Sequence, residues 1–152
     1  MRLFIIAVFA ATIGYTLSVV INSTVSAATL AGFGIEVALG DRAQMVTSEW
    51  LGLAGTYLPI YVGLHAIVFL LLNYVLNRPH TTHLSGAMWR ALFAVAGAGS
   101  LLLLYVGFDA AMGLSGVLVA SGRTFVGLSA HVATGALSGL IFAWLCARSP
   151  QA

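Results

Sequence analysis

The sequence predicts an all-α integral membrane protein, built as a bundle of four transmembrane helices. Of its 152 residues, 61% are hydrophobic and only 7% are charged, and the mean hydropathy is +1.04. A soluble domain carries about 25% charged residues, so most of this surface is not suited to water. The apolar residues also gather into four long runs. We expect the whole chain, residues 1–152, to form a single transmembrane domain.

Each run is long enough to cross about 30 Å of hydrocarbon, which takes about 20 helical residues. The predicted spans are residues 3–22, 51–76, 91–114 and 124–147. Arg2 before the first run, and the small residues from Val25 to Ala27 after it, also fit a signal peptide. The apolar run is long for a signal sequence, so we expect the first run to be retained as a span.

The connections between the spans differ in character. Residues 23–50 are too apolar for a free loop, and several glycines interrupt them, so we expect an interfacial or re-entrant segment over the outer mouth of the bundle. Residues 77–90 form the inner loop, which Pro79 opens by ending the second helix. Pro59, inside the second span, predicts a kink there.

Arginine placement predicts the orientation of the bundle. The chain has no lysine, and four of its six arginines fall on the side of the amino terminus: Arg2, Arg78, Arg90 and Arg148. The other side holds two arginines together with Glu36, Asp41 and Glu49, whose side chains we expect to be solvated. The positive-inside rule then places both termini in the cytoplasm. The use of Ala, Gly and Arg, with no lysine, is typical of a bacterial protein, so we expect the bacterial inner (cytoplasmic) membrane.

Two histidines lie inside the predicted spans and are candidates for binding a cofactor. His65 falls ~18 Å and His131 ~25 Å from the inner boundary, at ~1.5 Å per helical residue. Two imidazoles on two helices can ligate a haem b, and together with Tyr61 and Tyr105 they can hold a quinone. The difference of ~7 Å in depth strains the haem geometry. The simpler interpretation is two neutral histidines hydrogen-bonded to neighbours, such as Tyr61 or Asp109 for His131.

Asp109 is the strongest single functional candidate, because ionisable residues inside spans are costly and are usually paired or functional. With His131 it predicts a proton or ion path. Four spans enclose little volume, so such a transporter or channel is expected to be oligomeric. Pairing of Asp109 with His131 or Arg123 for structural reasons is the alternative interpretation.

Small residues recur every fourth position around His131 in the last span. On a helix this spacing aligns them on one face, which is typical of close helix packing. A flat cofactor or a lipid approaching the backbone is the alternative. The residues of this small-residue stripe are Gly127, Gly135, Gly139 and Ala143.

The sequence favours a non-enzymatic role. It contains no HExxH, GxSxG or phosphate-binding glycine loop. Its single cysteine, Cys146, excludes a cysteine-rich metal site, and a scattered net charge of +2 excludes a nucleic-acid partner. The main hypothesis is a small non-catalytic subunit that lies in the lipid bilayer and packs against larger membrane proteins or itself. A haem b or quinone anchor and a small oligomeric transporter or channel remain as alternatives.

Overall fold

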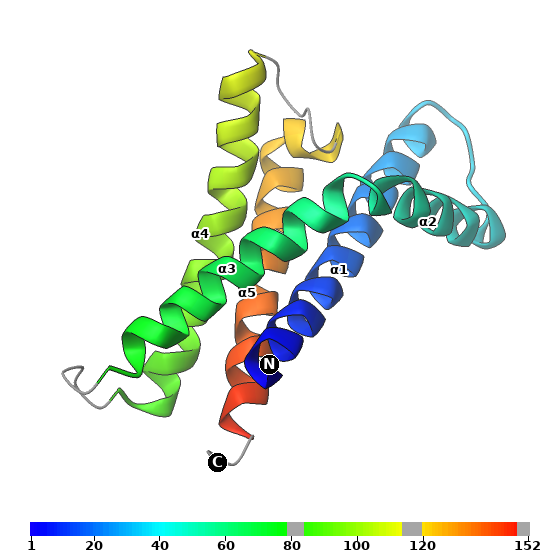
Figure 1. Ribbon diagram of the computed structural model, residues 1–152. Coiled ribbons are helices and arrows are strands. Elements are labelled where there is room, and N and C mark those ends of the chain that lie inside the picture. The colour runs from blue at the N-terminus through cyan, green and yellow to red at the C-terminus, as the bar shows by residue number, and fades with distance from the viewer. Residues whose placement is uncertain (79–83, 114–119, 149–152) are drawn as a thin grey trace.

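The computed structural model describes residues 1–78, 84–113 and 120–148 (Figure 1). Four helices of these residues are long and apolar enough to cross a membrane, so the prediction of an all-helical protein with four such helices is confirmed. They indicate an integral membrane protein in contact with the lipid bilayer. The helices are α1 (Arg2–Gly32), α2 (Leu39–Ala54), α3 (Tyr57–Leu76), α4 (Gly86–Met112), the short 3-10 helix η1 (Ala120–Arg123) and α5 (Phe125–Ala147).

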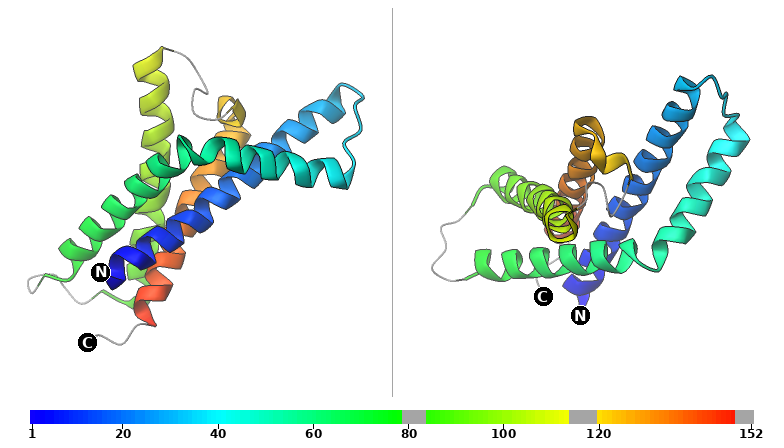
Figure 2. Two further views of the ribbon diagram at one scale, coloured as in Figure 1. Left: turned by 45° about the vertical axis from the view of Figure 1, so that its right-hand side comes forward. Right: turned by 90° about the horizontal axis from the view of Figure 1, so that it is seen from above.

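Helix α5 is central to the bundle. It packs against α4 along one side and against α1 along the other, while α3 crosses over them and contacts both α1 and α4 (Figure 1). Figure 2 shows the same arrangement from two further directions. Helices α1 and α4 begin, and α3 and α5 end, at one end of the bundle, which we call the termini end. The opposite end carries η1 and is called the η1 end.

Helix α1 is longer than predicted, because it continues past residue 22 to Gly32. The threonines beyond the predicted end do not interrupt it. The hydroxyls of Thr24 and Thr29 donate to the carbonyls of Val20 and Val25, each four residues earlier, at 2.7 and 2.9 Å. Such bonds satisfy the polar side chain inside the helix itself. The helix ends where Gly34 adopts the left-handed conformation, with φ of +80°.

Residues 23–50 do not form one separate segment, contrary to the prediction. The first ten of these residues belong to α1, and most of the rest belongs to α2, which runs back beside α1 to the start of α3 (Figure 2). The second predicted span is also wrong at its start, because residues 51–54 belong to α2 and the helix breaks at Gly55 and Thr56. Pro59 is the third residue of α3, in the first turn, where a backbone N–H has no partner within the helix. It therefore fits there without a kink.

Helices α4 and α5 begin at side-chain caps. The Ser85 hydroxyl accepts a hydrogen bond from the Met88 N–H at 3.2 Å, which starts α4 five residues before the predicted position 91. The Thr124 hydroxyl accepts from the Gly127 N–H at 3.0 Å, so α5 begins within one residue of the prediction. Pro79, predicted to end the second helix, lies outside the described residues.

The buried core divides along the bundle axis into two groups of aromatic side chains. Near the η1 end lies the tyrosine cluster: Tyr15, Tyr57, Tyr61 and Tyr105. Near the termini end lies the phenylalanine cluster: Phe69, Phe93 and Phe142, with Ala7, Ala10, Ala66 and Ala143 around it.

Candidate functional site

The tyrosine cluster brings together side chains from three helices. Tyr15 comes from α1, Tyr57 and Tyr61 from α3 and Tyr105 from α4, and none is more than 2% exposed. The Tyr57 and Tyr105 hydroxyls are 3.0 Å apart and share a hydrogen bond. The Tyr15 hydroxyl donates to the carbonyl of Trp50 at 2.8 Å, which ties α2 to the bundle. A buried tyrosine needs a partner for its hydroxyl, and here each one has it.

His131 lies beside this cluster and is fully buried. Its Nδ1 is 2.7 Å from the Ser18 hydroxyl of α1, and its Nε2 is 2.6 Å from the Ser121 hydroxyl of η1. The Tyr105 ring stacks on the imidazole, with ring centroids 5.3 Å apart. In a neutral imidazole one nitrogen donates and the other accepts, so one hydroxyl accepts from His131 and the other donates to it. Ser18 and Ser121, rather than the predicted Tyr61 or Asp109, are therefore its partners.

These contacts form one continuous hydrogen-bonded chain. Ser18 joins His131 to the Tyr57 hydroxyl, at 3.1 Å, and Tyr57 passes the chain on to Tyr105. The chain runs from η1 through α5, α1 and α3 to α4, so it links every spanning helix. We call it the hydroxyl–imidazole chain; in order along it, its members are Ser121, His131, Ser18, Tyr57 and Tyr105.

The hydroxyl–imidazole chain is tied to α2 at the η1 end. The Ser121 N–H donates to the Asn22 side-chain oxygen at 3.3 Å, and the Asn22 side-chain nitrogen donates to Glu49 at 2.9 Å. Glu49 is half-buried and so is less exposed than expected, whereas Glu36 and Asp41 are exposed as expected. Asn22 thus joins three separate segments, α1, η1 and α2.

Tyr61 and His65 lie one turn apart, toward the middle of α3. The Tyr61 hydroxyl is 3.2 Å from the Thr134 hydroxyl and 3.3 Å from that of Ser138, both on α5. His65 donates from Nδ1 to the Tyr61 carbonyl at 2.9 Å, and its ring stacks on the Tyr61 ring with centroids 4.3 Å apart. The Nε2 atom of His65 is buried and makes no hydrogen bond within the described residues.

The two histidines predicted to share a cofactor thus stack on different tyrosines. His65 stacks on Tyr61, and His131 stacks on Tyr105 with both of its nitrogens bonded to serines. A haem ligand needs a free nitrogen directed at the iron, which His131 does not offer in this arrangement. The haem b and quinone hypotheses stay predictions without geometric support from His131.

Asp109, the other predicted functional residue, is half-buried on α4, one helical turn beyond Tyr105. It is not a partner of His131, whose two nitrogens are bonded elsewhere. The phenylalanine cluster fills the core between these polar groups and the termini end. Phe142 packs within 5.0 Å of Phe93 and 5.2 Å of Phe69, measured between ring centroids. A proton or ion path through the bundle would have to cross these apolar rings, so the transport hypothesis also stays a prediction.

The small-residue stripe of α5 faces helices of the same chain. A Cβ atom on Gly135 would meet the Gly97 carbonyl of α4, and one on Gly139 would meet the Phe93 carbonyl. Gly127 is equally close to the Ser121 carbonyl, and Ala143 lies in the phenylalanine cluster. The stripe is buried against α4, η1 and the core, and so it is not available to a second chain.

Comparison with protein-family models, with curated proteins and with solved structures finds no match to this chain. A proposal of function therefore rests on the geometry of the bundle.

Proposed function

We propose that the protein is a small non-catalytic subunit of the membrane, which acts by packing its outer helix faces against transmembrane helices of other proteins. One observation carries this proposal. His131, the side chain best suited to chemistry, is held between Ser18 and Ser121 and covered by Tyr105, with no exposed surface. The polar groups of the core are thus used to join its own helices, and the outer faces remain for function.

The outward face of α4 supports the proposal. Val95 and Leu103 on this face are 70% and 74% exposed. They alternate with Gly99 and Gly107 at intervals of four residues, which places all four on one face of the helix. A Cβ atom on either glycine would meet nothing within 4 Å, so a neighbouring helix has room to approach the backbone.

The orientation and the membrane belong to the same proposal. Arg2, Arg90 and Arg148 all lie at the termini end, and the positive-inside rule favours the cytoplasm for that end. Both termini would then be cytoplasmic, in the inner membrane of a bacterium. The orientation can be tested with single cysteines placed at Arg2 and at Arg42. Their labelling by a membrane-impermeant reagent is measured in intact cells. Labelling at position 2 would overturn the orientation.

Purification from the native membrane tests the function. The tagged chain, extracted in a mild detergent, is expected to carry a second membrane protein in fixed stoichiometry. Gly99→Leu is expected to lose that partner and to keep its own fold, since it adds atoms only on the outside. Gly63→Leu, an equally open glycine on α3, is the matched control and is expected to retain the partner.

Two results would contradict the proposal. If the wild-type chain purifies alone as a monomer, it has no stable partner. If it purifies as a dimer, its partner is a second copy of the same chain. A Soret absorption band in the same sample would show a bound haem and would favour the redox alternative.

A further inference from the structure

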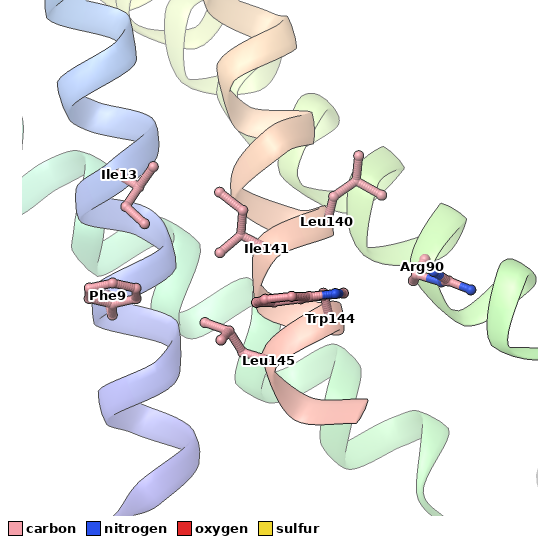
Figure 3. A pocket seen from close by; sticks show the side chains of 7 residues that line it. All are labelled: Phe9, Ile13, Arg90, Leu140, Ile141, Trp144 and Leu145. Carbon is pink, nitrogen blue, oxygen red and sulfur yellow. The ribbon is translucent and has the colours of Figure 1, made fainter. Parts of the chain in front are cut away.

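A groove on the outside of the bundle lies near the termini end and has no role in the contacts described so far. Its volume is about 490 Å³. Phe9 and Ile13 of α1 form one wall, and Arg90 of α4 lies at the far side (Figure 3). Between them, α5 contributes four apolar or aromatic side chains: Leu140, Ile141, Trp144 and Leu145.

The groove combines apolar walls with one cation. Six of its seven lining side chains carry no charge, and Arg90 is the exception. The Arg90 Nε donates to the Gly86 carbonyl at 3.1 Å, which orients the guanidinium at the start of α4. That is the one hydrogen bond of this guanidinium in the part of the chain that the structure describes. Because Arg90 is exposed, the four N–H donors of its two terminal nitrogens are accessible from outside the bundle.

The surroundings of the groove are positively charged. Arg148 stacks its guanidinium over the Trp144 ring, 3.7 Å from the ring centroid. Arg2 is the first residue of α1 and so lies at the same end of the bundle as the groove. The four acidic residues of the chain lie toward the other end, three of them before or within α2 and one near the end of α4. The groove therefore offers a cationic end with no acidic residue beside it.

We propose that this groove binds one anionic glycerophospholipid. Its acyl chain would lie along Phe9, Ile13 and Ile141, and its phosphate would contact Arg90, with Trp144 at the level of the headgroup. Apolar walls fit a hydrocarbon chain, and a guanidinium pairs with a phosphate through parallel N–H donors. Basic pockets between membrane helices on one side are typical sites for anionic headgroups. The proposal is independent of the function proposed above, since the groove lies apart from the outward face of α4.

Native mass spectrometry of the purified protein tests the site. Wild-type protein is titrated in detergent with phosphatidylglycerol or with phosphatidylcholine of the same acyl chains. We expect one retained phosphatidylglycerol per chain and about fivefold weaker retention of phosphatidylcholine, since one arginine near an anionic headgroup contributes about that factor. Arg90→Gln is expected to abolish the preference. Arg123→Gln, an exposed arginine at the η1 end, is the matched control and should behave as wild type.

Two further measurements distinguish a bound lipid from other possible occupants of the groove. Ile141→Trp fills the groove without changing its charge and should lower retention of both lipids. Inorganic phosphate at the same ionic strength should not displace the bound lipid. Equal retention of the two lipids by wild-type protein, or an unchanged preference in Arg90→Gln, would overturn the proposal, as would a protein helix found in the groove in place of lipid.

Discussion

The two halves of the core are built from the same spanning helices and are held together in different ways. Near the η1 end, the hydroxyl–imidazole chain joins α1, α3, α4, α5 and η1 by hydrogen bonds. Near the termini end, packed phenylalanine rings and the close approach of Gly139 to the Phe93 carbonyl hold the helices together. Gly97 and Gly135 meet midway between the two halves.

The difference shows how a membrane protein specifies its fold. Lipid is as apolar as the protein interior, so the hydrophobic effect does not draw these helices together. Van der Waals packing and hydrogen bonds between helices remain. The phenylalanine cluster depends on van der Waals packing, and the hydroxyl–imidazole chain depends on hydrogen bonds. Perturbing each half by itself shows how much each contributes.

The largest effect is expected where two backbones meet. Gly135→Leu places a side chain against the Gly97 carbonyl, so α4 and α5 must separate. We expect a loss of about 3 kcal/mol or more, which is at the upper end for an overpacked core, and a protein that unfolds or aggregates in detergent. Thermal unfolding followed by circular dichroism measures it. Gly99→Leu on the outer face of α4 is the control, and an equal loss there would contradict the packing described.

Opening a cavity in the phenylalanine cluster is expected to cost less. Phe142→Ala removes a ring that contacts both Phe69 and Phe93. We expect a loss of about 2–3 kcal/mol, mainly from the cavity and the lost contacts, since lipid offers little transfer free energy. Unfolding in mixed micelles measures it. Phe125→Ala, at an 85% exposed position on α5, should leave the stability nearly unchanged.

Removing His131 is expected to have a moderate effect on stability. His131→Ala breaks the bonds to Ser18 and Ser121 and leaves the buried Ser121 hydroxyl without its partner. We expect a loss of about 1–2 kcal/mol. A double-mutant cycle with Ser18→Ala isolates the bond and should give a coupling free energy below about 1.7 kcal/mol. A coupling free energy near zero would show that the Ser18–His131 bond does not stabilise the fold.

The smallest effect is expected from a single hydroxyl. Tyr57→Phe keeps the ring contacts of the tyrosine cluster and removes the bonds to Ser18 and Tyr105. Bonds between membrane helices average about 0.6 kcal/mol each, so we expect the loss of two bonds to cost about 1 kcal/mol. Tyr74→Phe, at an exposed tyrosine of α3, is the control in the same unfolding assay. A loss of stability larger than that of Phe142→Ala would show that the hydroxyl–imidazole chain stabilises the fold more than the phenylalanine cluster does.

Hydropathy was sufficient to predict the four spans, because each run alone is long and apolar enough. The end of α1 was not predicted, because threonines that bond to their own helix look the same in the sequence as threonines of a loop. The break before α3 was not predicted either, since Gly55 and Thr56 lie within an apolar run.

One of the two partners of His131 could be predicted from the sequence, and the other could not. Ser18 lies ~24 Å from the inner boundary by residue count, close to the ~25 Å of His131, so equal depth was a usable signal. Ser121 lies outside every span and reaches His131 only because η1 turns back before α5. The packing of Gly135 on Gly97 needs the pairing of α4 with α5, which neither glycine reveals by its own position.

The core contacts hold the helices of the bundle together, and we propose that the outer face of α4 binds another protein. Photo-crosslinking in native membranes tests it most directly, with the crosslinking residue at Leu103 on that face and, as a control, at the exposed Phe125 of α5. We expect one defined protein adduct from position 103 and none from position 125. Adducts with lipid alone at position 103 would contradict it.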